Sequence, residues 1–556
     1  MASIPHTSYT DFRDFTFNDV GRDQVNMVFC AYQLRVERES DDEWASLSLA
    51  GSQDSLEKLK PVEMNASKRT SCLQDTRTAF LQFVFNWIND TNSQQNILWI
   101  HGLAGSGKST LSNTIASVSG HSGQLGAFLF FDRDVTERSD PAMVIRTLAH
   151  QLGSSDPRLG AAIRAIIEKN SNILLSPLAL QFQRLIFDPL ASFDDPISPI
   201  VVVLDALDEC GTAEERGTLL EVLANDFGRL PLYIRTIVTS RAEIDICNAF
   251  KPQQHILARE LDITSPANSD DILSYFQYRM ALIRSQKRHL RLAEDWPGER
   301  VFLQLVQRAS GLFVWASTVS EFINGHDPRK RLDVILSGEI TSGAEAALDI
   351  LYKTALESIG CWDDEDFTTD FREIMGIVLI ARQPLSSRAI DTLMQLPEDR
   401  PSMHTISLLG CVLQQSPTVR VLHPSFADFL MTRERCRRDT WFFNQSIYHR
   451  ILAFRCLDRM NEVLKRNMCN MTLAVDQTHE MLPEDVAYSC LFWIDHISSI
   501  GVDFLPVMVR LCDFLNQHLL HWFEAMSILR KSRYTIPLLD HLIDWISVSP
   551  CVIIRF

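Results

Sequence analysis

The sequence predicts an α/β core with a mostly parallel sheet, followed by a long helical region. Apolar, strand-like runs alternate with helical segments over Ile97–Leu257, the pattern of a parallel sheet covered on both faces. A glycine-rich stretch joins the first of these strands to a helix, and from Asp270 onward the pattern is helical. With 556 residues and 46% hydrophobic content, the chain can form several packed domains.

The residues before the core are predicted to form a variable leader segment and one helix. Residues 1–65 are polar and weakly patterned, which favours a variable leader, although Phe15–Asn26 alternates like a small strand and leaves a short adhesive or signalling motif as the alternative. A helix is predicted over Ser67–Asp90 with Thr76 as its N-cap. Its apolar face is formed by Phe80, Val84, Trp87 and Ile88.

A phosphate-binding loop is predicted at Gly102–Ser109, which fits Gly-x-x-x-x-Gly-Lys-Ser between a strand and a helix. Its glycines permit positive φ, its N–H groups form an anion-binding concavity, and the helix N-terminus adds positive charge. Lys108 would reach the β- and γ-phosphates, and the Ser109 hydroxyl would ligate Mg²⁺. The alternative is a turn that only links strand to helix. The candidate nucleotide-binding residues are Gly102, Ala104, Gly105, Ser106, Gly107, Lys108, Ser109 and Thr110.

Further strands and helices complete the predicted core. The strands are expected at Ile97–Ile100, Gly126–Phe131, Pro199–Asp205, Ile234–Thr239 and Gln254–Leu257. The helices are expected at Pro141–Leu152, Arg158–Lys169 and Ser176–Phe193.

The strand ending at Asp205 carries a second candidate element for nucleotide chemistry. A carboxylate at the tip of a buried strand beside the phosphate loop can hold the Mg²⁺ shell, and Asp205 is the candidate. Hydrolysis also needs a group that orients or deprotonates water, and Glu209 with Asp208 beside it fits that role.

Arg241 follows the next core strand and is a candidate γ-phosphate sensor, with an ordinary surface arginine as the alternative. The guanine-reading Asn-Lys-x-Asp element is not found, which favours adenine. The implied ligands are therefore ATP or ADP with Mg²⁺.

Charge and cysteine content restrict the compartment and the partners. The net charge of −17 argues against non-specific affinity for nucleic acid or anionic membranes. The twelve cysteines are scattered without Cys-x-x-Cys, and neither an apolar signal core nor a bilayer-length apolar run is found. These features predict a cytoplasmic protein without a membrane span or a nucleic-acid partner.

The later half of the chain is predicted to be helical, with one short strand-like segment at Val419–His423. Its sequence shows no repeat. Gly325 is the expected C-cap of the second helix. The helices are expected at Asp270–Arg284, Glu299–Asn324, Ala344–Ser358, Phe371–Ala381, Ser386–Met394 and Phe426–Met431, with further helices over Trp441–Ile546.

Three motifs in this order resemble those of fungal NACHT proteins with a nephrocystin-type P-loop region, which are signalling ATPases of the STAND class. They are Gly102–Ser109, Leu204–Cys210 and Ile237–Arg241. The stretches Arg69–Leu73, Gly311–Ala316 and His423–Leu430 also look family-like.

The resemblance implies a particular order of domains. These are a variable segment (1–65), a pre-domain helix (66–95), the NTPase core (96–260), a helical domain (261–340), a winged-helix-like domain (341–440) and a helical C-terminal region (441–556). Two departures are visible, because Gly311-Leu312-Phe313 stands where many relatives have Gly-x-Pro, and the usual ligand-sensing repeats do not follow.

The resemblance also implies a function: a nucleotide-operated switch in fungal innate immunity or non-self recognition. It would bind ADP in a closed form and ATP in an open form, hydrolyse ATP slowly, and assemble with itself in the ATP state. His423 would contact the β-phosphate of ADP, or else be an ordinary buried histidine. The alternatives are a constitutive P-loop ATPase or kinase-like enzyme, and a scaffold with a vestigial site.

Overall fold

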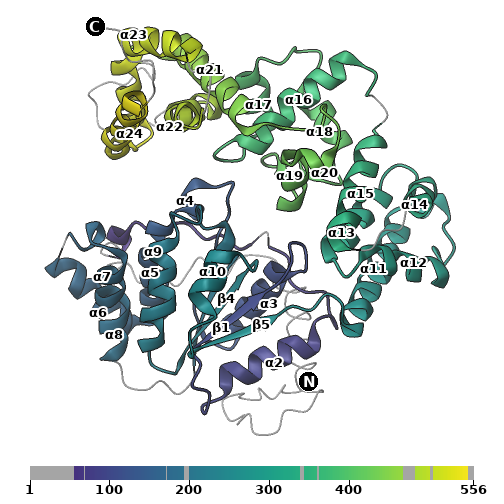
Figure 1. Ribbon diagram of the computed structural model, residues 1–556, viewed down its shortest axis with the longest axis horizontal. Coiled ribbons are helices and arrows are strands. Elements are labelled where there is room, and N and C mark those ends of the chain that lie inside the picture. The colour runs from purple at the N-terminus through teal and green to yellow at the C-terminus, as the bar shows by residue number, and fades with distance from the viewer. Residues whose placement is uncertain are drawn as a thin grey trace, which may run out of the picture.

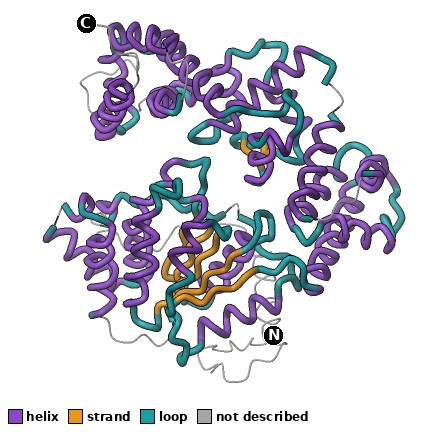
Figure 2. Tube along the Cα trace, in the orientation of Figure 1, coloured by secondary structure: helices purple, strands orange, loops and turns teal. Residues whose placement is uncertain are grey.

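Five parallel strands form the sheet of the first half of the chain (Figure 2). The strands are β1 Ile97–His101, β2 Leu125–Phe130, β3 Ile200–Asp205, β4 Ile234–Ser240 and β5 Ile256–Glu260. They are ordered β2-β3-β4-β1-β5, and every neighbouring pair is parallel. The predicted α/β core with a parallel sheet is therefore confirmed. The computed structural model describes residues 56–67, 69–170, 172–192, 199–338, 343–359, 362–467, 482–500 and 505–548. The predicted strand at Phe15–Asn26 lies outside these residues.

Helices cover both faces of the sheet because its strands are apolar on both sides. In β1, Ile97 and Trp99 join the apolar core beneath α5, α6 and α10, whereas Leu98 and Ile100 join the core beneath α2 and α3. The helices of this half are α2 Thr78–Asn89, α3 Lys108–His121, α4 Thr136–Ser139, α5 Val144–Ser155, α6 Pro157–Lys169, α7 Leu178–Phe182, α8 Asp188–Ala191, α9 Gly217–Glu221 and α10 Ile244–Phe250.

The second half is helical, as predicted, and it turns back so that its last helices lie over the α4 edge of the core (Figure 1). Its helices are α11 Pro266–Gln286, α12 Glu299–Ala309, α13 Phe313–Ile323, α14 Pro328–Ser337, α15 Ala344–Glu357, α16 Glu365–Ile380, α17 Ser387–Met394, α18 Ser402–Leu408, α19 Pro424–Met431, α20 Arg433–Cys436, α21 Gln445–Val463, α22 Glu484–Ser498, α23 Leu505–Ile528 and α24 Thr535–Val548. The Lys531 ammonium, between α23 and α24, donates a hydrogen bond to the Glu137 carboxylate of α4 (2.7 Å), which joins the last helices to the core. The short strands β6 Leu413–Gln414 and β7 Arg420–Val421 form an antiparallel pair.

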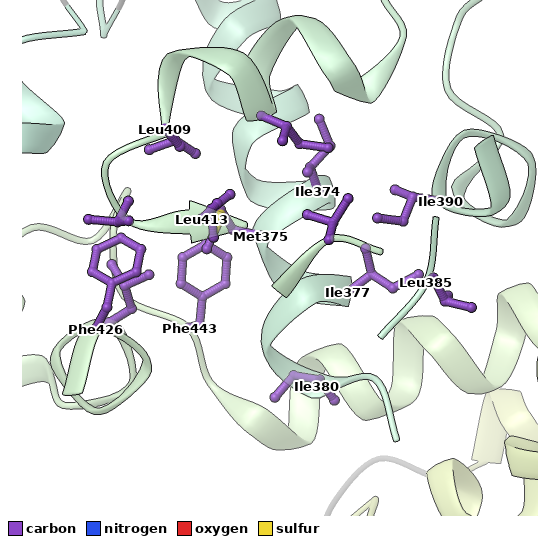
Figure 3. Close-up of a cluster of buried hydrophobic side chains, with 14 of the residues drawn as sticks. Ile374, Met375, Ile377, Ile380, Leu385, Ile390, Leu409, Leu413, Phe426 and Phe443 are labelled. Atoms are coloured by element: carbon purple, nitrogen blue, oxygen red, sulfur yellow. The ribbon is translucent and has the colours of Figure 1, made fainter. Parts of the chain in front are cut away.

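One continuous apolar core holds the helical half together, and Figure 3 shows the part around α16. The labelled side chains are Ile374, Met375, Ile377, Ile380, Leu385, Ile390, Leu409, Leu413, Phe426 and Phe443. This cluster fixes β6, β7 and α19 against α16. Among the described helices, none combines the length and apolar content that a bilayer span needs.

Several predicted helix boundaries are wrong, and α16 begins at Glu365, before the predicted start at Phe371. The helix before the core begins at Thr78 with Arg77 at its N-cap, because Thr76 instead donates its hydroxyl to the Leu73 carbonyl (2.6 Å) in a preceding turn. The helix predicted over Glu299–Asn324 is broken between α12 and α13 at Gly311, where φ is +80°. Accordingly α13 ends at Ile323, and its C-cap is Asn324, not Gly325.

Gly376 of α16 packs directly against the Tyr448 ring of α21. A Cβ at residue 376 would lie 2.2 Å from two ring atoms of Tyr448, which is buried. We expect Gly376→Ala to destabilise the helical half by about 1–3 kcal/mol, because an overpacked core must shift backbone or side chains. Thermal unfolding measures this.

The matched control is Gly217→Ala at the first residue of α9, where an added Cβ meets nothing within 4 Å. We expect this variant to unfold at the wild-type temperature or slightly above it. Equal unfolding temperatures for both variants would contradict the close packing at Gly376.

Candidate nucleotide-binding site

The predicted phosphate loop follows β1, at the edge of the sheet where β3 and β4 also end. Gly105 and Gly107 have φ values of +77° and +96°, so both adopt the left-handed conformation that glycine permits. Gly107 is the N-cap of α3, whose first residue is Lys108. The loop therefore presents its backbone at a helix N-terminus, the geometry that binds anions.

Lys108 folds back onto this loop. Its ammonium donates hydrogen bonds to the carbonyls of Gly102 (2.9 Å) and Leu103 (2.8 Å). Burial lowers the pKa of Lys108, and the nearby charge of Asp208 opposes that shift. The ammonium is thus held at the loop by weak neutral acceptors, which an anionic ligand can replace.

A cavity of about 1350 Å³ lies against the loop. Its volume exceeds that of typical ligand pockets, roughly 300–1,000 Å³, so it can hold a nucleotide. The loop residues that line it are Ala104, Gly105, Gly107, Lys108, Ser109 and Thr110. Gly102 and Ser106 are predicted site residues that do not line it, and the Ser106 carbonyl accepts a hydrogen bond from Arg77 (2.8 Å).

The walls of this cavity come from four parts of the chain. The segment before the core contributes Arg69–Leu73 and Arg77, and the core contributes Asp208, Glu209 and Arg241 in addition to the loop. The first helical elements contribute Tyr275 and Phe313, and the β6–β7 region contributes Gln414 and Leu422–Pro424.

Asp205 is fully buried and does not line the cavity. Its Oδ1 accepts hydrogen bonds from the hydroxyls of Ser112 (2.9 Å) and Thr239 (2.6 Å), and its Oδ2 forms an ion pair with Arg69. The carboxylate is therefore fully partnered by the protein.

The residues present fit a magnesium ion that is held largely by a nucleotide's phosphates. The Ser109 hydroxyl is exposed at the cavity wall and is a hard oxygen ligand. Asp205, the other predicted magnesium ligand, is separated from the cavity by Arg69, so of the two only Ser109 lines the cavity. In the described part of the chain, clusters of three His, Cys, Asp or Glu residues that could hold a metal are not found.

Asp208 and Glu209 follow β3 and line the cavity together. Burial raises the pKa of Glu209 to about 8, with the charge of Arg133 opposing the shift and that of Asp208 adding to it. Asp208 accepts the backbone N–H of Arg241 (3.0 Å) and pairs with its guanidinium (3.2 Å). The predicted sensor and the predicted catalytic carboxylates are thus neighbours.

His423 also faces the phosphate loop, since its Cε1 would lie 3.7 Å from a Cβ placed at Gly105. Its Nδ1 accepts the backbone N–H of Ser425 (3.1 Å) and so caps α19. Burial lowers the pKa of His423 to about 3, and the charges of Arg241 and Lys108 lower it further. The neutral ring therefore carries its proton on Nε2, which has no hydrogen-bond partner among the described residues.

Several site residues had no role predicted from the sequence. Val314 donates its backbone N–H to the Gly105 carbonyl (3.1 Å), and Arg77 lies over the Phe313 ring (4.9 Å). Only the family-like stretches at 69–73 and 311–316 signalled the partners of the loop. Asp428 lies in the family-like stretch at 423–430 but had no predicted role, and its partner Arg133 (3.2 Å) carried no signal.

The sheet order, the strand–loop–helix geometry and the cavity define the class of this protein as one with a core of the P-loop NTPase type. Residues 75–241 match the family model of the nephrocystin 3 N-terminal region. The chain is similar to the vegetative incompatibility protein HET-E-1 of Podospora anserina, with 24% identity over 472 residues. This match covers 78% of the chain but only 33% of the relative, so the chain spans about a third of that protein's length.

These two matches confirm the resemblance drawn from the motifs, and they support a fungal NACHT family of the STAND class for this chain. Among solved structures, a chain of the Drosophila ORC bound to GC-rich DNA and Cdc6 matches with 12% identity and a TM-score of 0.21. That match covers 99% of this chain and 78% of the other, and its TM-score is too low to support any inference about the fold.

The raised pKa of Glu209 makes stability depend on pH. Between its ordinary value of 4.5 and about 8, the folded protein holds a proton that the unfolded chain has lost. The resulting stabilisation is complete below pH 4.5 and is lost as the pH rises toward 8. We expect Glu209→Gln to reduce this loss, which amounts to at most about 1.4 kcal/mol per pH unit.

The measurement is the unfolding temperature of protein stripped of nucleotide, between pH 5 and pH 8. Glu214→Gln, at an exposed glutamate of the same loop, is the control and should follow the wild type. If the Glu209 and Glu214 variants follow the same pH profile, the raised pKa is contradicted.

Proposed function

We propose that this protein is a nucleotide-operated signalling switch of the STAND type. It binds ATP or ADP with Mg²⁺ and hydrolyses ATP slowly, with Glu209 and Asp208 acting on the attacking water. The ATP form assembles with further copies of the chain. The relative HET-E-1 is described as a vegetative incompatibility protein, and we propose fungal non-self recognition as the setting.

The observation that carries this proposal is the composition of the cavity wall. The phosphate loop is enclosed by the core, by α11 and α13, and by the region around His423, so its ligand touches elements that are far apart in the sequence. A ligand can shift a conformational equilibrium only through contacts that differ between two forms, and such a cavity provides them. A metabolic P-loop enzyme needs no helical half of this size.

Lys108→Ala tests the site itself. We expect nucleotide affinity to fall by about tenfold or more, because the variant loses a charge-assisted phosphate contact. The wild-type protein should release ADP or ATP when it is purified and denatured, and the variant should release none. Lys251→Ala, at an exposed lysine next to α10, is the control and should retain its nucleotide.

Unchanged affinity in Lys108→Ala would contradict the site assignment. Turnover separates the switch from the constitutive enzyme, since slow intrinsic NTPases run at ~10⁻⁴–10⁻² per second. Many turnovers per second without an activator would exclude the switch.

His423 is proposed as the group that recognises the diphosphate in the closed form. Its Nε2–H can donate to a phosphate oxygen, because Nδ1 is already used to cap α19. The low pKa keeps the ring neutral, so this donor is present across the physiological range.

His423→Ala should therefore weaken ADP binding more than ATP binding. The lost hydrogen bond to a charged group is worth ~1.5–3 kcal/mol, or roughly 10- to 150-fold in ADP affinity. Calorimetric titration with both nucleotides measures the difference. His423→Asn serves as the control for capping, because asparagine is also a good N-cap.

In both variants, the affinity for ADP should fall more than the affinity for ATP. A loss seen with alanine but not with asparagine would mean that His423 acts only by capping α19.

A further inference from the structure

Asp428 of α19 lies between two arginines of the core. Its Oδ2 is 3.2 Å from Nη1 of Arg241, and its Oδ1 is 3.2 Å from Nη1 of Arg133. Each carboxylate oxygen thus serves one guanidinium. The three residues come from α19, from the end of β4 and from the loop after β2, so this ion-pair cluster joins the helical half to the core.

Arg241 is shared between two carboxylates. Within the core it pairs with Asp208 through Nε (3.2 Å), while its Nη1 reaches out to Asp428. Arg241 lines the cavity together with Lys108, whereas Asp428 approaches from outside the cavity wall. One guanidinium therefore faces the candidate phosphate site and the helical half at once.

A carboxylate and a phosphate are recognised by arginine in the same way, through paired N–H donors directed at anionic oxygens. The terminal phosphate of a triphosphate has three such oxygens and more negative charge than one carboxylate. A diphosphate lacks this group. Arg241 lines the cavity and Arg133 does not, so Arg241 is the arginine that can exchange Asp428 for the terminal phosphate, while Arg133 holds the other oxygen of Asp428.

We propose, on the basis of the function proposed above, that Asp428 competes with the terminal phosphate of a nucleoside triphosphate for Arg241. While Asp428, held also by Arg133, pairs with Arg241, the protein disfavours the triphosphate. Binding of the triphosphate withdraws Arg241 from Asp428 and so removes one of the two ion pairs between α19 and Asp428's partners in the core. The Asp428 carboxylate thus sets the preference between the two nucleotides, and it links that preference to the contact between α19 and the core.

Besides this cluster, an ion pair and a hydrogen bond also join the core to the helical half. Arg420 pairs with Asp132 at 3.6 Å, and Thr136 donates its hydroxyl to the Arg382 carbonyl (3.1 Å). Ion pairs between partly exposed side chains contribute little individually. Asp428 makes two such pairs at once, and removing its charge removes both together.

Asp428→Asn tests the proposal, because it keeps the shape of the side chain and removes its charge. The measurement is the affinity for ADP and for a non-hydrolysable ATP analogue. We expect the preference for the ATP analogue over ADP to rise on the order of tenfold, which corresponds to ~1.4 kcal/mol.

The matched control is Asp349→Asn. Asp349 is as exposed as Asp428, at 24% of its side chain, and it also pairs with an arginine, Arg435 (2.6 Å). That pair lies between α15 and α20, away from the cavity. Its loss should cost similar stability and leave the preference between nucleotides unchanged.

A second variant, Arg133→Gln, leaves α19 itself unchanged and removes one partner of Asp428. We expect it to raise the preference for the ATP analogue over ADP, in the same direction as Asp428→Asn. An unchanged preference in Asp428→Asn, or equal shifts for both nucleotides as in a merely structural role, overturns the competition. If the wild-type protein binds neither nucleotide, the proposed function fails and this inference fails with it.

Discussion

In the part of the chain that the structure describes, one backbone hydrogen bond, from the Val314 N–H to the Gly105 carbonyl, joins the helical half to the phosphate loop. Residue 105 must be glycine for two reasons. Its φ is positive, and a Cβ there would lie 2.1 Å from Cγ1 of Val314. Because α13 begins at this contact and is part of the apolar core of the helical half, the later helices take their position relative to the cavity from it.

Around this contact, three charged groups of the site are each neutralised by a group of opposite charge or held by carbonyls. Asp205 is partnered by Arg69, Arg241 by Asp208 and Asp428, and the Lys108 ammonium by two carbonyls. Buried charges persist only when they are partnered in this way. An anion that reached Lys108 or Arg241 would therefore replace partners that these two cations already have.

The sequence predicted those parts of the structure that local patterns determine. The β-branched run at Ile200–Asp205 and the glycine-lysine pattern at Gly102–Ser109 specify a strand and a loop within a few residues. It did not predict the break at Gly311, where the close approach to Ile263 is a tertiary contact. Nor did it predict ion pairs between residues far apart in the chain, such as Asp428 with Arg133, 295 residues away. Such pairs depend on how the second half folds back, which periodicity does not encode.

The pairing of Arg69 with Asp205 bears on where the folding unit begins. The two residues are 136 positions apart, and Asp205 is fully buried at the tip of a central strand. A shortened polypeptide that started at β1 would leave this carboxylate with two hydroxyl partners and no counter-charge. A buried charge that loses its partner is strongly destabilising. Fragments of this core made for expression or crystallisation should therefore start ahead of Arg69, because the stretch before β1 belongs to the core and is not a detachable linker.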